Sequence, residues 1–145
     1  MATGDGAPSP RSVVDHLMAI SPVVQHWGIE LVDAGQGTVR MEMDVRPDMG
    51  NTHGVCHGGV IFTLGDACFG FSANSYNDRT IAASCEIKFL APGEVGDRLT
   101  AVSTEVWRKG RSGLYDVTIT NRQGDKVAIL RGHARMTGGK VIDEN

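Results

Sequence analysis

The residues best suited to chemistry lie between positions 57 and 66, in the stretch HGGVIFTLGD. A His-Gly-Gly turn leads into an almost wholly apolar run, and Asp66 stands in the middle of that run. No other residue between His57 and Asp78 carries a formal charge. Because burial disfavours a charged carboxylate, we expect a raised pKa for Asp66 and regard it as a candidate catalytic group.

A structural role for Asp66 is the simplest competing interpretation, because buried polar side chains usually accept hydrogen bonds from backbone N–H groups. The run has helical length and too little polarity for a surface helix, so we expect an enclosed helix over about residues 59–75. In the middle of a helix the backbone N–H groups already bond to the helix itself. The pattern therefore favours a functional carboxylate.

Gly65 and Gly70 interrupt the apolar run inside this expected helix. Each glycine destabilises a helix interior by roughly 1 kcal/mol relative to alanine. We therefore expect another part of the structure to pack against the helix backbone at close range at both positions.

The pair Gly58 and Gly59 stands at the start of the expected helix. Two glycines alone indicate no more than a permissive turn. At the N-terminus of an enclosed helix, however, free N–H groups and the helix dipole stabilise an oxyanion, and glycine lets a ligand approach the backbone. Together with a carboxylate that acts as nucleophile or general base, this arrangement predicts acyl transfer to water.

Gly58 and Asp66 are too far apart to act on one carbonyl group within one chain. They are eight positions apart (66 − 58 = 8), which corresponds to roughly 12 Å along a helix. Two copies of the helix, antiparallel across a two-fold axis, would bring the N-terminus of one to the middle of the other. The sequence therefore predicts an obligate homodimer with two shared sites.

Two histidines stand near the glycine pair. His53 and His57 have a spacing that would suit a metal on a helix, but the neighbouring glycines make a helix there implausible, so we expect no metal site. His57 is interpreted instead as a loop residue that holds the helix start or a ligand amide.

A strand serine and a basic turn are weaker candidates. Ser84 is expected on the polar face of a strand with Glu86 and Lys88, opposite an apolar face that includes Ile81 and Cys85, and strand serines are usually inert. The segment WRKGRSG is more often a solvated hairpin tip than a phosphate clamp. In an acidic protein that handles a phosphorylated ligand, it is the best local anion site.

The composition limits the partners and the location. The chain has 145 residues, a formal net charge of -3 and a pI near 5.9, which indicate one domain and argue against a nucleic-acid binder. Its three cysteines show no CxxC spacing, so we expect neither a disulfide framework nor a zinc site, and a reducing cytoplasm fits best. The pattern of a signal peptide and a run long enough to span a bilayer are both missing, so no membrane association is expected.

The elements that position these residues follow from hydrophobic periodicity. Ser9 and Pro10 predict a helix over about residues 10–19, and period-two alternation predicts a hairpin around residues 35–37. Beyond the enclosed helix, turn signals separate four strands, expected at residues 80–92, 97–110, 112–123 and 126–137. This order predicts an α+β fold with an antiparallel sheet around one helix, in a single domain over residues 10–137 with tails at 1–9 and 138–145.

The segments NTHGVCHGG and FTLGD together resemble the hotdog-fold acyl-CoA thioesterases, in particular the branch named for the phenylacetate-degradation thioesterase PaaI. The pattern of that branch runs Asn, Gly, His-Gly-Gly and then Asp within the central helix. The spacings from His57 and from Asn51 to Asp66 both match, and the resemblance covers roughly residues 28–137. Gly65 is a small departure, because alanine is frequent there in the family.

The resemblance implies a role for each matching residue. Asp66 corresponds to the catalytic carboxylate, either as the nucleophile on the thioester or as the base that activates water. Gly58 supplies the backbone N–H that polarises the thioester carbonyl, with help from His57, and Asn51 orients the attacking water or the carbonyl. Ser84 falls where related enzymes carry a hydroxyl residue that assists the water.

The resemblance also implies how subunits and substrate are arranged. Asp66 and Ser84 are expected from one subunit and the other three residues from its partner, in dimers that commonly pair into homotetramers. No metal or redox cofactor is implied. The residues assigned to substrate binding, most of them near the CoA phosphates, are Gly59, Lys88, Arg108, Lys109, Gly110 and Arg111.

We therefore predict a cytoplasmic, homo-oligomeric acyl-CoA thioesterase that releases a free acid and coenzyme A. Aryl-acetyl substrates, such as phenylacetyl-CoA or hydroxyphenylacetyl-CoA, are the first choice. The apolar residues near the site would accept an aromatic ring or an aliphatic chain equally well, so the sequence is also compatible with a medium- or long-chain acyl-CoA thioesterase. A hotdog hydratase or dehydratase is a rival enzyme, and a non-catalytic module that binds acyl-CoA is a rival from another class.

Overall fold

The structure is a computed structural model that describes residues 6–144. Residues 1–5 of the predicted N-terminal tail lie outside this range. The elements in chain order are α1 (Pro10–Ile20), α2 (Pro22–His26), β1 (Glu30–Gly35), β2 (Thr38–Asp44), the short 3-10 helix η1 (Pro47–Met49), α3 (Gly58–Asn74), β3 (Asp78–Phe89), β4 (Arg98–Lys109), β5 (Ser112–Thr120) and β6 (Lys126–Lys140).

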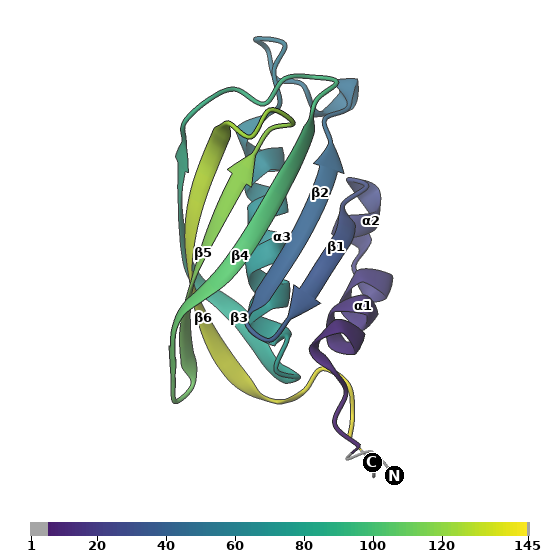
Figure 1. The fold of residues 1–145 in the computed structure, drawn as a ribbon, viewed down its shortest axis with the longest axis vertical. Coiled ribbons are helices and arrows are strands. Elements are labelled where there is room, and N and C mark those ends of the chain that lie inside the picture. The colour runs from purple at the N-terminus through teal and green to yellow at the C-terminus, as the bar shows by residue number, and fades with distance from the viewer. Residues whose placement is uncertain (1–5, 145) are drawn as a thin grey trace.

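The six strands form one antiparallel sheet in the order β1-β2-β4-β5-β6-β3, so β1 and β3 are its edges. The sheet curves around α3, while α1 and α2 lie beside β1 (Figure 1). This arrangement confirms the predicted α+β fold with an antiparallel sheet wrapped around one long helix. β6 continues to Lys140, into the segment that the sequence assigns to a C-terminal tail.

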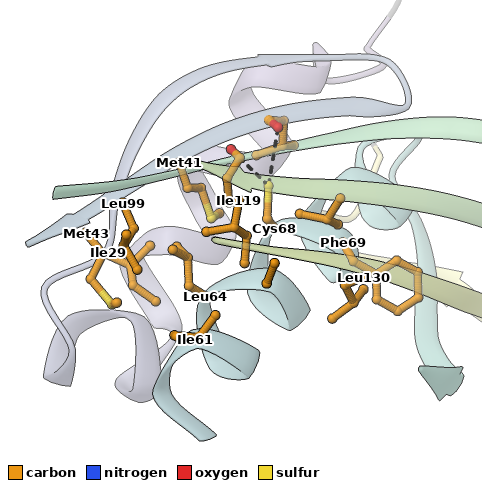
Figure 2. Packing of buried hydrophobic residues seen from close by; sticks show 14 of the residues in the cluster. Ile29, Met41, Met43, Ile61, Leu64, Cys68, Phe69, Leu99, Ile119 and Leu130 are labelled. Carbon is orange, nitrogen blue, oxygen red and sulfur yellow. Dashed lines mark hydrogen bonds between the residues drawn. The ribbon is translucent and has the colours of Figure 1, made fainter. Parts of the chain in front are cut away.

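The core lies between α3 and the inner face of the sheet. Leu64, Cys68 and Phe69 of α3 are fully buried and point toward the strands (Figure 2). The Cys68 thiol donates hydrogen bonds to the carbonyl oxygens of Val39 and Ala101, at 3.3 and 3.5 Å. The predicted enclosed helix is therefore confirmed, with each end within one residue of its expected position.

The two glycines inside α3 have different surroundings. A Cβ atom at Gly65 would lie 3.2 Å from a methyl group of Leu130 and 3.3 Å from one of Ile119, so the sheet packs closely against the helix there. A Cβ atom at Gly70 would meet no such neighbour within 4 Å among residues 6–144. The prediction of close packing is confirmed at Gly65 and wrong at Gly70, where the space beside the helix is open.

The N-terminal helices cover one side of α3. The Ser9 hydroxyl accepts a hydrogen bond from the N–H of Ser12 at 3.1 Å and Pro10 opens α1, as predicted. Val13 and Val14 are fully buried where α1 packs against β1 and α3. Sequence reasoning missed α2, although Pro22 directly after a serine is the same start signal that identified α1.

β3 departs from the predicted alternation. A bulge between Ala82 and Ser84 gives this strand an extra residue relative to β6. Cys85 faces the helix, whereas Ile81 is 58% exposed and pairs with the exposed Arg135. The prediction that Ile81 shares the buried face with Cys85 is therefore wrong, because the bulge moves the residues before it to the opposite face.

Candidate active site

His57 is the N-cap residue of α3. Its Nδ1 atom accepts a hydrogen bond from the N–H of Gly59 at 2.9 Å, and its carbonyl oxygen accepts one from the N–H of Val60 at 2.9 Å. Because Nδ1 accepts, a neutral imidazole carries its proton on Nε2. His57 therefore holds the helix start, and it occupies the N–H of Gly59, a residue assigned to substrate binding.

The N–H of Gly58 lies at the positive end of the α3 dipole. Among residues 6–144 no acceptor forms a hydrogen bond with it. A Cβ atom on Gly58 would lie 3.2 Å from the ring of Phe89, so this side chain covers the Cα atom. Gly58 thus presents a free N–H beside an apolar ring, which suits the stabilisation of an oxyanion.

Asn51 organises the loop that precedes α3. Its Oδ1 atom accepts hydrogen bonds from the N–H groups of His53 at 2.8 Å and Val55 at 3.2 Å, and its own N–H donates to the carbonyl of Val55 at 2.7 Å. The Nδ2 group forms no hydrogen bond within the described chain. The Asn51 side chain is therefore able to donate to a ligand while its oxygen holds the loop.

Asn51 and Gly58 open into the same surface hollow, which has a volume of about 380 Å³. The structure therefore brings together two residues predicted from the sequence. Phe89 and Leu90, more than half exposed, form part of the wall. The other lining residues are Val55, Cys56, Ile61, Ala91, Pro92 and Gly93.

Asp66 is half-buried on α3 and faces β3. Burial raises the pKa of its carboxyl group, in the predicted direction, and the thiol of Cys85, 3.8 Å from Oδ1, lowers it in part. Burial also raises the pKa of Cys85 to about 11, so the thiol stays protonated and donates. Sequence reasoning missed Cys85; a cysteine on the inward face of the strand next to the helix was the available signal.

Asp66 opens into a second hollow of about 270 Å³, between α3 and the α1–α2 segment. Gly58 does not line this hollow, and Asp66 does not line the first one. Eight residues of α3, or roughly 12 Å, separate the two groups. Within one chain, therefore, the free N–H and the carboxylate serve different surfaces.

Ser84 does not lie beside Asp66 within the chain. It is exposed and pairs with His133, on the face of β3 opposite to Cys85. Lys88 shares that outer face and forms an ion pair with Glu86 at 2.9 Å. The predicted polar face of Ser84, Glu86 and Lys88 is therefore confirmed, and Cys85 is the strand residue that contacts the carboxylate of Asp66 within the chain.

The basic turn lies between β4 and β5, at the opposite end of the sheet from the start of α3 (Figure 1). Arg108 forms an ion pair with Asp78 at 3.1 Å and lies over the ring of Tyr76, 3.8 Å from its centroid. Arg111 forms no ion pair within residues 6–144 and lines a hollow of about 250 Å³. Gly110 adopts φ +60°, which favours glycine in the turn.

Further observations concern metals, membranes and thiols. Within residues 6–144 no group of three or more His, Cys, Asp and Glu side chains is placed to hold a metal ion. Across the same residues, each helix is too short or too polar to cross a membrane. Cys56, Cys68 and Cys85 are free thiols.

Comparison with known proteins gives consistent matches. The sequence pattern of the thioesterase superfamily matches residues 53–128, which include His57, Gly58 and Asp66. The chain is 37% identical to the acyl-coenzyme A thioesterase PaaI of Escherichia coli over 117 residues, which cover 81% of this chain and 84% of that protein.

Solved structures show the same likeness. The E. coli PaaI protein from the phenylacetic acid degradation operon matches with a TM-score of 0.89 and 32% identity, over 90% of this chain and 95% of that chain. A Streptococcus mutans protein bound to acetyl-CoA matches with a TM-score of 0.75 and 28% identity, over 77% and 90% of the two chains. These matches confirm the predicted hotdog fold.

Proposed function

Because this chain belongs to the thioesterase superfamily and is a thioester hydrolase, we propose that it hydrolyses aryl-acetyl-CoA thioesters to the free acid and coenzyme A. The names of the relatives support this choice of substrate. The E. coli relative is an acyl-coenzyme A thioesterase, and it comes from the phenylacetic acid degradation operon. The acetyl-CoA in the Streptococcus mutans structure supports the CoA thioester as the reacting group.

Asp66 is the proposed catalytic carboxylate. As a general base it takes a proton from water while the oxygen attacks the carbonyl carbon; as a nucleophile it attacks directly and forms an anhydride that water then hydrolyses. In both routes the C–S bond breaks and the CoA sulfur leaves as a thiolate that takes up a proton. Both routes need ionised Asp66, and its raised pKa makes the ionised form a stronger base.

The thioester carbonyl oxygen is proposed to bind at the start of α3. It would accept hydrogen bonds from the N–H of Gly58 and from Nδ2 of Asn51, which share one hollow and have no other partner among residues 6–144. His57 acts as a positioning residue, because its hydrogen bond with Gly59 fixes the helix start. These donors would stabilise the negative charge that develops on the oxygen.

The two halves of the site are proposed to come from two copies of the chain. The separation of Gly58 from Asp66 along α3 supports this arrangement. β3 supports it too, because an edge strand presents unpaired N–H and C=O groups to which the β3 of a second copy can bind. A homodimer built in this way holds two sites, each with Asp66 and Cys85 from one copy and Gly58 and Asn51 from its partner.

The single observation that carries this proposal is that one helix, α3, holds both a free N–H at its start and a carboxylate of raised pKa in its middle. The test is thiol release from a panel of aryl-acetyl and straight-chain acyl-CoAs. We expect the wild type to prefer the aryl-acetyl esters, and Asp66→Asn, which keeps the shape of the side chain, to lose at least ~100-fold in kcat. Equal rates for Asp66→Asn and wild type would reject the role of the carboxylate.

A further inference from the structure

We propose that the acyl group of the substrate binds in the hollow between α3 and the α1–α2 segment, and that Gly70 sets the depth of this hollow. The inference rests on the proposed thioesterase function, because it takes Asp66 as the group that acts on the thioester. It goes further in assigning selectivity for the acyl group to Gly70 and to the N-terminal helices.

The chemistry of the hollow fits an apolar acyl group. Two of its polar side chains already form hydrogen bonds with the helix backbone. The Thr63 hydroxyl donates to the carbonyl of Gly59 at 2.8 Å, and the Asn74 amide donates to the carbonyl of Gly70 at 2.7 Å. Among the described residues, Asp66 is the only charged one in the lining, which also contains the Ser21 hydroxyl. The apolar lining residues are Leu17, Val23, Val24, Ala67 and Phe71.

The position of Asp66 decides which arm of the thioester enters this hollow. The carbon attacked near Asp66 carries the acyl group on one side and the sulfur of the pantetheine arm on the other. The pantetheine arm contains amides that need hydrogen-bond partners, and the Asn51 hollow is lined by loop residues and an amide side chain. The apolar hollow beside Asp66 therefore suits the acyl arm.

Gly70 keeps this hollow open. It follows Asp66 by four residues, so both lie on the same face of α3. A Cβ atom at this position would lie in open space within the described chain, so a larger residue would fit. The glycine is nevertheless present, although glycine is unfavourable inside a helix. Since no atom of residues 6–144 beyond the adjoining helix backbone and chain neighbours lies within 4 Å of that Cβ position, we assign the space to the end of the acyl group.

α2 supplies the opposite wall. Val23 and Val24 both line the hollow; Val24 is buried and anchors this short helix, whereas Val23 is 52% exposed. Val23 and Gly70 belong to different elements and border the same space. A single larger residue at either position would therefore narrow the hollow.

The test compares phenylacetyl-CoA with acetyl-CoA for the full-length wild type, Gly70→Leu and Val23→Phe. Each variant should lower kcat/KM for phenylacetyl-CoA at least ~tenfold. The kcat/KM for acetyl-CoA should stay within about twofold of the wild-type value, because only the larger acyl group meets the new side chain. Gly70→Ala, which adds one methyl group in open space, should fold normally and show a smaller change in the same direction.

The outcomes separate the inference from the proposed function. If wild type hydrolyses neither thioester, the proposed function fails and the inference falls with it. If the wild type is active but each variant lowers kcat/KM equally for the two substrates, or changes kcat/KM for neither, the acyl site is elsewhere. The inference would also be overturned if Gly70→Leu changed the oligomeric state measured by sedimentation while Val23→Phe kept the wild-type selectivity. That result would show that a second copy of α3 occupies the space beside Gly70.

Discussion

The Sγ atom of Cys85 lies 3.8 Å from Oδ1 of Asp66, and this hydrogen bond joins the central helix to an edge strand. Burial disfavours the charge on Asp66, and the thiol hydrogen bond partly offsets that effect. The pKa of the thiol itself is raised to about 11, so it remains a donor at neutral pH. Cys85 is thus placed to regulate the basicity of the proposed catalytic carboxylate.

Replacement of Cys85 should change the pH dependence of the enzyme. Cys85→Ala removes a donor to the ionised carboxylate, which raises the pKa of Asp66 further. Because activity requires ionised Asp66, the acidic limb of the kcat/KM profile should move to higher pH. Cys85→Ser keeps a donor and should move the limb less than Cys85→Ala. Superimposable profiles for wild type and Cys85→Ala would show that the thiol has no influence on the reacting group.

The N–H of Gly58 can be removed without removing the helix. His57 has φ -60° and ψ 134°, which a following proline favours, and the first helical position tolerates proline. Gly58→Pro should therefore retain α3 and lower kcat ~100- to 1,000-fold. Gly58→Ala is the matched control, since it adds a Cβ atom against Phe89 but keeps the N–H. Similar kcat values for the two variants would argue against the backbone donor.

Asn51→Asp separates the two functions of the Asn51 side chain. The carboxylate can still accept from the N–H groups of His53 and Val55, so the loop and the melting temperature should be preserved. The Nδ2 donor is lost and a negative charge faces the developing oxyanion, so kcat should fall at least ~100-fold. A variant that melts as wild type and keeps full kcat would contradict the donor role.

Hybrid dimers test whether sites are shared. Asp66→Asn and Asn51→Asp subunits should each be inactive alone, while a hybrid holds one site with both substitutions and one with neither. Equal mixing after full exchange should recover about a quarter of wild-type activity, because half of the dimers are hybrids with one intact site. Exchange is verified with differently tagged subunits, and no recovery after verified exchange would place each site within a single chain.

Arg111 is the cation of the basic turn best placed to meet a phosphate, because no carboxylate pairs with it in the described chain and, unlike Lys109, it lines a hollow. Arg111→Ala should raise KM ~tenfold for phenylacetyl-CoA and leave KM unchanged for the phenylacetyl ester of pantetheine, which lacks the nucleotide phosphates. Arg122→Ala, an exposed arginine of the β5–β6 turn, is the control and should affect neither. Equal increases for both esters would exclude a phosphate contact.

The sequence by itself determined the order of α1, the central helix and the six strands, and the identity of the central carboxylate. Local periodicity carried this information: alternation predicted the strands, and the enclosed apolar run predicted the helix that holds Asp66. The spacing of Gly58 and Asp66 also followed from sequence, because the rise of a helix is fixed. The motif around His57 then gave the resemblance that the comparisons confirmed.

Only the tertiary structure decided which distant groups meet. The bulge in β3 moved Ile81 outward, and the packing of β3 against α3 placed Cys85 beside Asp66. Similarly, the register of the sheet brought Arg108 to Asp78, thirty positions away. Bulges and open space such as that beside Gly70 arise from the packing of whole elements against each other, which the local sequence pattern does not encode.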